Sequence, residues 1–325
     1  MDIEVVETES ILEWVQGGRE VLFEHENADA CLSWLTARPL VDRRHRAPVE
    51  AVSVVRKNAF SLTTAETDVI INALTALSRT DIWYRYAQLH EQVSSGDNSV
   101  HGWFRQNQPD GNATNIHNAY HRFLPWHRLF LWDFEAQMRA QSANAFIPYW
   151  DWTIASQRRL PPWIERVPTS LVQTGSSARF NVTRSVSTST PLVDPGDYRK
   201  LPTRAQISAL MTSNTGLDPR TSPRTTVMTD NYNNFTAVME GLHGPPHAWI
   251  GGTMAGFKSP GDFMFFMHHA QIDRLWRTWQ RSFPGERPSL TGRAAELQRV
   301  GGPTMHFGKV LSVIGLGFDY DSAWS

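Results

Sequence analysis

The stretch SPGDFMFFMHHAQIDRLWRTWQR (Ser259–Arg281) decides the fold of this 325-residue chain. Its first four residues, Ser259–Asp262, supply the proline and the capping residues that commonly start a helix. Apolar residues then recur at three- and four-residue spacing, which predicts a long helix with a thick apolar face from about Pro260 to Arg281. The stretch also carries two adjacent histidines, His268 and His269.

Other segments repeat this helical pattern. Capping residues and periodic apolar residues predict helices at 61–77, at 82–92, from Pro125 in FLPWHRLFLWDFEAQMRAQ, and at 203–211. Only short strands are expected, such as one at 309–314. The pattern indicates a mainly α fold built around a helix bundle, with long irregular loops and a few short strands.

Three stretches lack a readable pattern. Residues 93–116 are rich in Ser, Asn, Gly, Asp and Pro, and residues 155–230 in Ser, Thr, Arg and Pro, so both are expected to be irregular. Residues 1–50 are interpreted as an N-terminal extension of unknown role. We expect residues 1–325 to form a single catalytic domain with its core at about 54–285.

Composition excludes several classes of protein. The 31 basic and 32 acidic residues give a net charge of −1, which argues against a nucleic-acid or membrane-surface binder. No apolar run approaches the roughly 18 residues of a membrane span, and the acidic start is unlike a secretory signal, so a cytoplasmic location is expected. The single cysteine, Cys31, excludes an internal disulfide framework and Cys-rich metal sites.

The histidines are distributed unevenly. Twelve are present, and nine of them fall into two clusters. These clusters are His90, His101, His117, His121 and His127, and then His243, His247, His268 and His269. Imidazole suits zinc, copper, iron and nickel.

The pattern around these histidines narrows the choice of metal. Carboxylate-bridged iron pairs need repeated Glu-x-x-His motifs, and only Glu240-Gly-Leu-His243 fits that pattern. A zinc hydrolase needs three ligands, which would leave the second cluster unexplained. Two sets of three histidines without cysteine fit a pair of copper ions better.

Three motifs resemble the tyrosinase family of type 3 copper proteins, which includes tyrosinases, catechol oxidases and molluscan-type hemocyanins. They are FLPWHR (123–128), PYWDW (148–152) and SPGDFMFFMHHAQIDRLW (259–276). The resemblance covers roughly residues 54–281. It implies a four-helix bundle that houses a dicopper centre, with three histidines binding each copper.

The family pattern assigns two ligands of the first copper directly. His127, which follows Leu-Pro-Trp, matches the third ligand, and His90, which closes WYRYAQLH (83–90), resembles the first. His101 lies in the polar loop and is a weaker rival for the first ligand.

The middle ligand of the first copper is less clearly marked. The family usually places it nine residues before the Pro-Trp-His histidine, at the position that Asn118 occupies here. We assign His117, one residue farther away, with His121 as the rival. Asn115 stands where fungal and plant members have the cysteine of a Cys–His thioether, so the chain resembles bacterial members more.

The second copper is marked more clearly. His243 and His247 look like the family's paired ligands, and His269 matches the remaining one. His268 is then expected in a supporting position. The prolines Pro245 and Pro246 disfavour a continuous helix between the paired histidines, so a helix is expected to start at Pro246.

Other residues near these ligands are assigned roles by the resemblance. Asp273, one turn after His269, could accept the spare N–H of that ligand, or instead pair with Arg277 on the surface. Glu240 resembles the glutamate that positions a water as base in some members, the alternative being a surface carboxylate. Gly244 stands where many monophenol-hydroxylating members have Asn, which favours oxidation of diphenols or o-aminophenols.

The resemblance implies an oxidoreductase that uses O2 and two copper ions to oxidise o-diphenols or o-aminophenols to o-quinones, with weak monophenol hydroxylation. A full tyrosinase with strong monophenolase activity and a hemocyanin-like oxygen carrier remain alternatives, and a zinc hydrolase is a third class. The expected partners are a small phenolic substrate and O2, with no nucleic acid and no membrane. The sequence is also compatible with a homo-oligomer.

Overall fold

A computed structural model of the protein describes most of the chain after residue 52. The described residues are 53–94, 99–102, 113–190, 201–212, 215–218, 220–221 and 225–324. The predicted N-terminal extension, residues 1–50, lies outside them, as does Cys31.

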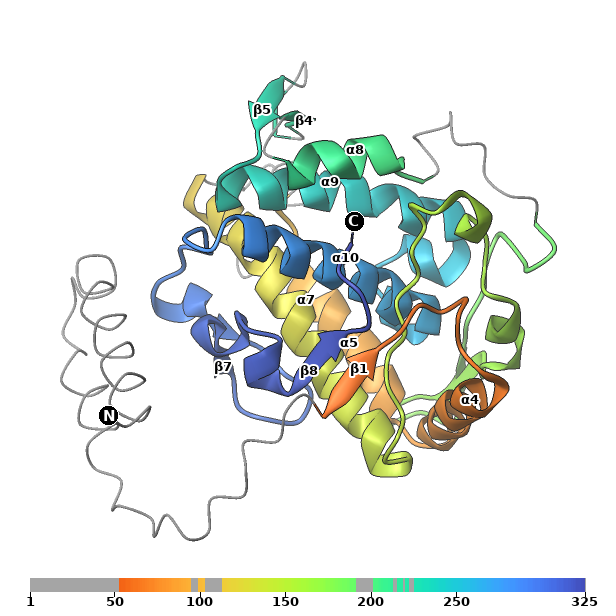
Figure 1. Cartoon of the computed structure of the whole chain (residues 1–325). Helices are drawn as coiled ribbons and strands as arrows, with labels where there is room; N and C mark the ends of the chain where they lie inside the picture. The colour runs from red at the N-terminus through yellow and green to blue at the C-terminus, as the bar shows by residue number, and fades with distance from the viewer. Residues whose placement is uncertain are drawn as a thin grey trace, which may run out of the picture. The chain divides into compact units, whose positions relative to one another are not determined.

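Helices dominate the described part of the chain, as Figure 1 shows. The α-helices are α4 (Thr64–Ser78), α5 (Ile82–Ser94), α7 (Ala113–Gln141), α8 (Arg204–Met211), α9 (Tyr232–Ile250) and α10 (Phe263–Ser282). Short 3-10 helices lie at Ala155–Gln157, Pro162–Arg166, Gly252–Ala255, Ser259–Gly261, Gly292–Ala295, Phe307–Val310 and Ile314–Leu316. The mainly α fold expected from the sequence is confirmed.

The strands among the described residues are short and pair two by two. Parallel β1 (Val54–Arg56) and β8 (Phe318–Tyr320) join the two ends of this region. The antiparallel pairs are β2 (Ser170–Val172) with β3 (Arg179–Asn181), β4 (Thr215–Leu217) with β5 (Thr226–Met228), and β6 (Glu296–Leu297) with β7 (Met305–His306). The strand predicted at 309–314 is wrong, because this segment forms 3-10 turns just before β8.

The bundle is built around α7, which contacts α4, α9 and α10 (Figure 1). Helix α10 begins with Asp262 as its cap, whose side chain accepts the N–H of Met264. Every residue of α10 from Phe263 to Trp276 is buried. The thick apolar face predicted for this stretch therefore packs inside the bundle.

Helix α4 also begins where the capping pattern predicted. Thr63 accepts the backbone N–H of Glu66, and the Glu66 carboxylate accepts the N–H of Thr63 in return. This reciprocal arrangement satisfies two donors that would otherwise be unpaired at the helix start.

Helix α7 begins at Ala113, so the start predicted near Pro125 is wrong. A proline inside a helix supplies no N–H to the carbonyl four residues earlier, which here belongs to His121. The Tyr232 hydroxyl of α9 donates to that carbonyl at 3.2 Å. Tertiary contact thus replaces the missing helical hydrogen bond and lets the helix continue through the proline.

Helix α9 likewise continues through Pro245 and Pro246, so the break predicted there is wrong. In the same turn the ring N–H of His268 donates to the carbonyl of His243 at 3.1 Å. This contact ties α9 to α10 where two backbone donors are absent. Packing in the bundle therefore overrides the local preference against helix.

A buried ion network joins β1, α7, α10 and β8. The Arg56 guanidinium donates to both carboxylate oxygens of Glu135 at 3.1 Å. Asp273 accepts from Arg128 and from the Tyr320 hydroxyl, each at 2.5 Å, and lies 3.5 Å from Arg56. Burial alone would lower the pKa of Arg56, but the neighbouring Glu135 carboxylate raises it above its ordinary value. The guanidinium is therefore charged and paired.

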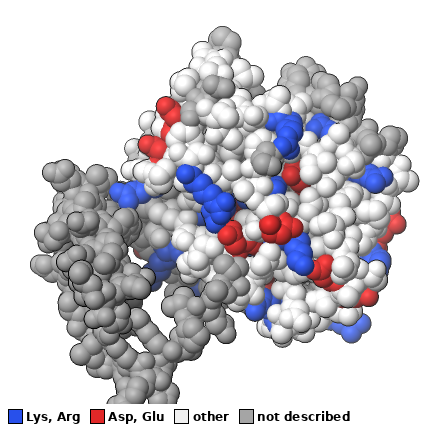
Figure 2. Space-filling view, in the orientation of Figure 1, with Lys and Arg blue, Asp and Glu red and all other residues white. Residues whose placement is uncertain are grey.

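The charged side chains on the surface of the described residues are mixed in sign. On the face shown in Figure 2, basic and acidic side chains are interspersed among a larger number of uncharged residues. Among the described helices, none combines the length and the apolar character needed to cross a membrane.

Asp273→Asn is expected to lower the free energy of unfolding of the apoprotein by about 3–5 kcal/mol, because Arg56 and Arg128 lose a buried counter-charge. Urea denaturation followed by circular dichroism measures this change. Asp68→Asn is the matched control, because Asp68 pairs with Arg166 at an exposed site, and its cost should stay below about 1 kcal/mol. Equal costs for the two substitutions would contradict a stabilising role of the buried network.

Candidate metal centre

Two groups of histidines lie close together inside the bundle. Within each group the possible ligand atoms lie within 4.8 Å of one another. The groups are His90, His101 and His127, and then His243, His247, His268 and His269. The rings of His127 and His269 stack at 4.2 Å between centroids with an angle of 8°, so the two groups adjoin.

The helices bring these residues together through their buried faces. His90 lies on α5 one turn after Tyr86, and both side chains are buried. His269 lies on α10 one turn after Phe265, and the two rings are 4.1 Å apart. Phe265 also packs edge-on against His90 at 5.1 Å, so it shields ligand-forming rings from both groups.

Four of these imidazoles are oriented by backbone carbonyls that accept a hydrogen bond from Nδ1. The pairs are His90 with Phe257 at 2.6 Å, His127 with Phe123 at 2.7 Å, His243 with Glu240 at 2.9 Å, and His247 with Met254 at 2.8 Å. A carbonyl oxygen can only accept, so each Nδ1 carries the proton. Each Nε2 therefore holds a lone pair.

The lone pairs of His90 and His247 point at ring nitrogens of neighbouring histidines. His90 Nε2 lies 3.3 Å from His101 Nε2, and His247 Nε2 lies 3.2 Å from His269 Nε2. His127 Nε2 is buried without a hydrogen-bond partner among the described residues. Buried acceptors without donors are costly, and a cation at their centre would satisfy them.

Protonation of the imidazoles themselves does not supply this positive charge. Burial lowers the pKa of His90, His127, His243 and His269 well below the ordinary value. It also lowers the pKa of His247 to about 4. The rings are therefore neutral at physiological pH, which is the state that ligates a metal. The residues present fit a pair of imidazole-bound metal ions.

His268 lies in the second group but has no nitrogen available for a metal. Its Nδ1 accepts from the indole N–H of Trp152 at 3.0 Å, and its Nε2 donates to the carbonyl of His243 at 3.1 Å. Trp152 of the PYWDW motif (148–152) is thus linked to the centre through His268. In the same motif, the backbone N–H of Trp150 donates to the Met267 carbonyl at 3.0 Å.

The structure does not bring His117 into the centre, so it corrects that assignment. His117 is exposed and lies ten residues before His127 on the continuous helix α7, about 15 Å along the axis. Its ring packs on His121 at 4.0 Å instead. His121 is also excluded from the centre, because its Nδ1 accepts the backbone N–H of Ser289 at 2.8 Å.

His101 occupies the place that sequence reasoning gave to His117. It lies in the short described segment 99–102, outside any helix, and its backbone N–H donates to the Ser99 hydroxyl at 3.0 Å. Helical periodicity carries no signal for a ligand on such a loop. The sequence had suggested this loop histidine only as a weaker rival to His90, whereas the structure places the two rings together.

Asp273 does not contact His269, so the structure corrects that assignment too. Its carboxylate is directed toward Arg128, Tyr320 and Arg56, away from the imidazoles. The alternative partner, Arg277, pairs with Asp319 instead, as does the neighbouring Arg281 at 4.0 Å. The Nδ1 atom of His269 is buried without a partner among the described residues.

Glu240 is buried, with 4% of its surface exposed, so the alternative of a surface carboxylate is wrong. One carboxylate oxygen accepts the backbone N–H of Gly102 at 3.1 Å, and the other lies 3.6 Å from His101 Nδ1. Gly244 lies beside His243, and a Cβ built there would meet no atom within 4 Å.

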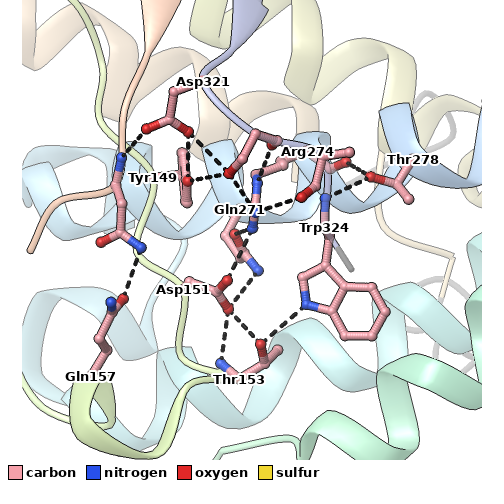
Figure 3. Close-up of polar contacts among 12 residues, drawn as sticks. Tyr149, Asp151, Thr153, Gln157, Gln271, Arg274, Thr278, Asp321 and Trp324 are labelled. Atoms are coloured by element: carbon pink, nitrogen blue, oxygen red, sulfur yellow. Dashed lines mark hydrogen bonds and ion pairs between the residues drawn. The ribbon is translucent and has the colours of Figure 1, made fainter. Parts of the chain in front are cut away.

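A second polar network fixes the outer side of α10, as Figure 3 shows. Asp151 accepts from Gln271 at 3.0 Å and forms an ion pair with Arg274 at 3.0 Å. Arg274 in turn donates to the carbonyls of Ser322 and Ala323 at 2.9 and 3.1 Å. The helix that carries His268 and His269 is thereby held by a second set of contacts in addition to the network around Asp273.

Comparisons with known proteins identify the family. The family model for the common central domain of tyrosinase matches residues 80–282. A tyrosinase of Streptomyces antibioticus is 32% identical over 257 residues, covering 73% of this chain and 86% of the relative. The grixazone synthase of Streptomyces griseus is 29% identical over 271 residues, covering 71% and 85%.

Solved structures share the fold. A functional unit of octopus hemocyanin aligns with a TM-score of 0.55 at 20% identity, covering 83% of this chain and 68% of that one. The polyphenol oxidase of Grenache grape, Vitis vinifera, aligns with a TM-score of 0.56 at 17% identity, covering 82% and 84%. The chain therefore belongs to the tyrosinase family of type 3 copper oxidoreductases, whose centre holds two copper ions.

Proposed function

We propose that the protein uses O2 to oxidise o-diphenols to o-quinones, or o-aminophenols to the corresponding o-quinone imines, and that it hydroxylates monophenols only weakly. The observation that carries the proposal is the convergence of neutral imidazole lone pairs from two adjoining groups. Imidazole donors suit copper, and neither described group contains a carboxylate that would favour a harder cation.

The ligand set follows from the geometry of the two groups. One copper takes His90, His101 and His127 as ligands, and the other takes His243, His247 and His269. His101 thus replaces His117 in the set inferred from the sequence. His268 stays outside it because both of its nitrogens are already hydrogen-bonded.

The chain's own residues have two tasks in this reaction. The backbone carbonyls hold the Nδ1 protons, so the ligands keep one orientation through the reaction. Phe265 and the surrounding aromatic rings exclude water from the ligand side. When bound, the copper pair supplies the exchange of four electrons by which two diphenols become two quinones and O2 becomes two water molecules.

We attribute the preference for diphenols over monophenols to Gly244. Hydroxylation of a monophenol needs its phenolic proton to be removed at the site, and the position after His243 carries no side chain that could orient a water for this step. A full tyrosinase with strong monophenolase activity is the alternative. It requires another group to take up that proton.

An oxygen carrier is the second candidate, because the fold is shared with a functional unit of octopus hemocyanin. The same ligands would serve reversible binding of O2. Turnover of catechol separates the two candidates, since a carrier releases O2 unchanged.

His101→Ala is expected to reduce the copper content from two ions to one per chain and to lower catechol oxidation by at least about 100-fold, because one copper loses a ligand. Metal analysis and quinone absorbance measure the two effects. His117→Ala is the matched control and should retain both coppers and the original rate. If His117→Ala instead loses one copper and His101→Ala keeps both, His117 is the ligand.

Gly244→Asn is expected to raise the ratio of monophenol to diphenol turnover by about tenfold or more, because the new amide can orient a proton-accepting water. A Cβ at this position meets no atom within 4 Å, which leaves room for the side chain. Steady-state rates with a monophenol and its matching catechol measure the ratio. Gly244→Ala, which adds bulk without an amide, should leave it unchanged, and an equal rise in both variants would refute the explanation.

A further inference from the structure

Glu240 contacts one proposed ligand of each copper. Its backbone carbonyl accepts the Nδ1 proton of His243 at 2.9 Å. Its carboxylate lies 3.6 Å from Nδ1 of His101 and accepts the N–H of Gly102 at 3.1 Å. Glu240 of α9 therefore contacts a histidine of each group at Nδ1, the ring nitrogen away from the metal-facing Nε2.

His101 needs such a contact more than the ligands on helices do. A helix fixes the direction of its side chains, whereas His101 lies in the segment 99–102, between two stretches outside the described residues. Local bonds of this segment run from the Val100 N–H to the Val93 carbonyl, from the His101 N–H to the Ser99 hydroxyl, and from that hydroxyl to the carbonyls of Ser94 and His101. None of them contacts the imidazole ring.

Gly102 allows the segment to approach α9 closely. A Cβ at this position would lie 2.3 Å from the ring of Tyr120, closer than real contacts allow. Glycine lets the backbone rest against that ring, and its N–H then reaches the Glu240 carboxylate. The loop that carries His101 is thus fastened to the same turn of α9 that orients His243.

We propose that Glu240 is a positioning residue that sets the place and the tautomer of His101, the loop ligand of one copper. This inference rests on the proposed function. A carboxylate oxygen 3.6 Å from Nδ1 of His101 attracts the ring proton to that nitrogen, which leaves Nε2 to face the metal. The rings of His101 and His243 lie nearly parallel, 5.9 Å apart at 15°.

This role differs from that of a base that positions a water, which the sequence had suggested for Glu240. A base acts on the substrate proton, and its loss leaves both coppers in place. A positioning residue acts through His101, and its loss weakens one copper selectively. The copper ligated by His243 keeps its anchor, because a backbone carbonyl survives any side-chain substitution.

The test is Glu240→Gln in the full chain. The amide oxygen can still accept from Gly102, but the amide N–H2 then faces the Nδ1 proton of His101, so two donors oppose each other. We expect the affinity for one copper to fall by about 10–100-fold. During dialysis against a graded chelator, the variant should pass through a form with one copper per chain.

Electron paramagnetic resonance gives a readout that does not depend on activity. Two coupled Cu(II) ions give no signal, whereas a single remaining Cu(II) does. The one-copper form of Glu240→Gln should show the signal of a mononuclear site with nitrogen ligands. Glu240→Asp, whose carboxylate is one methylene shorter and withdraws from His101, should show the same selective loss.

Glu286→Gln is the matched control. Its carboxylate also accepts a backbone N–H of α9, that of Tyr232 at 2.9 Å, but it does not belong to either histidine group. This variant should retain two coppers with the original affinity. Circular dichroism of the apoproteins should be the same for all three variants, which separates selective copper loss from unfolding.

Three outcomes decide the proposal. Selective loss of one copper in Glu240→Gln supports it. Retention of both coppers with unchanged affinity and a lower phenol oxidation rate overturns it in favour of a base, and loss of both coppers together overturns it in favour of a general structural role. A wild-type protein that binds two coppers without oxidising catechol would instead contradict the proposed function.

Discussion

The centre depends on one constraint, which is that buried imidazoles must keep their Nε2 lone pairs directed inward. Four backbone carbonyls impose this by accepting the Nδ1 protons. Because a carbonyl cannot donate, the other tautomer would lose a buried hydrogen bond, which commonly costs about 1–3 kcal/mol. The fold thus prepares an array of acceptors that a cation can satisfy.

Such an array stays in place only if the helices that carry it cannot shift. Helix α10 is held by two neighbouring residues, Asp273, which pairs with Arg128 of α7, and Arg274, which pairs with Asp151 (Figure 3). Both ion pairs are buried, so removing a partner leaves an uncompensated charge, which is far more costly than removing an exposed pair. The polar groups around α10 therefore make displacement of His269 energetically unfavourable.

The sequence predicted most of the helices and the existence of two histidine groups, because helical periodicity and capping are local properties. It failed where distant contacts override local preference. The Tyr232 hydroxyl lets α7 pass through Pro125, and without that bond the predicted helix start would have been reasonable. The assignment of His117 followed the family's spacing before the Pro-Trp-His histidine, whereas on the continuous helix α7 His117 is exposed and lies ten residues before His127. His101 could not be placed by periodicity, since it belongs to no helix.

The same reasoning explains why one short segment of α9 carries so much of the proposed chemistry. Residues 240–247 include a carboxylate that faces the loop ligand, two imidazoles and the open position Gly244. Two prolines in this segment remove backbone donors, and the ring N–H of His268 binds the His243 carbonyl in the same turn. These eight residues span about two helical turns. One short stretch of α9 therefore carries residues proposed both for metal binding and for substrate preference, so substitutions within it are expected to affect both properties.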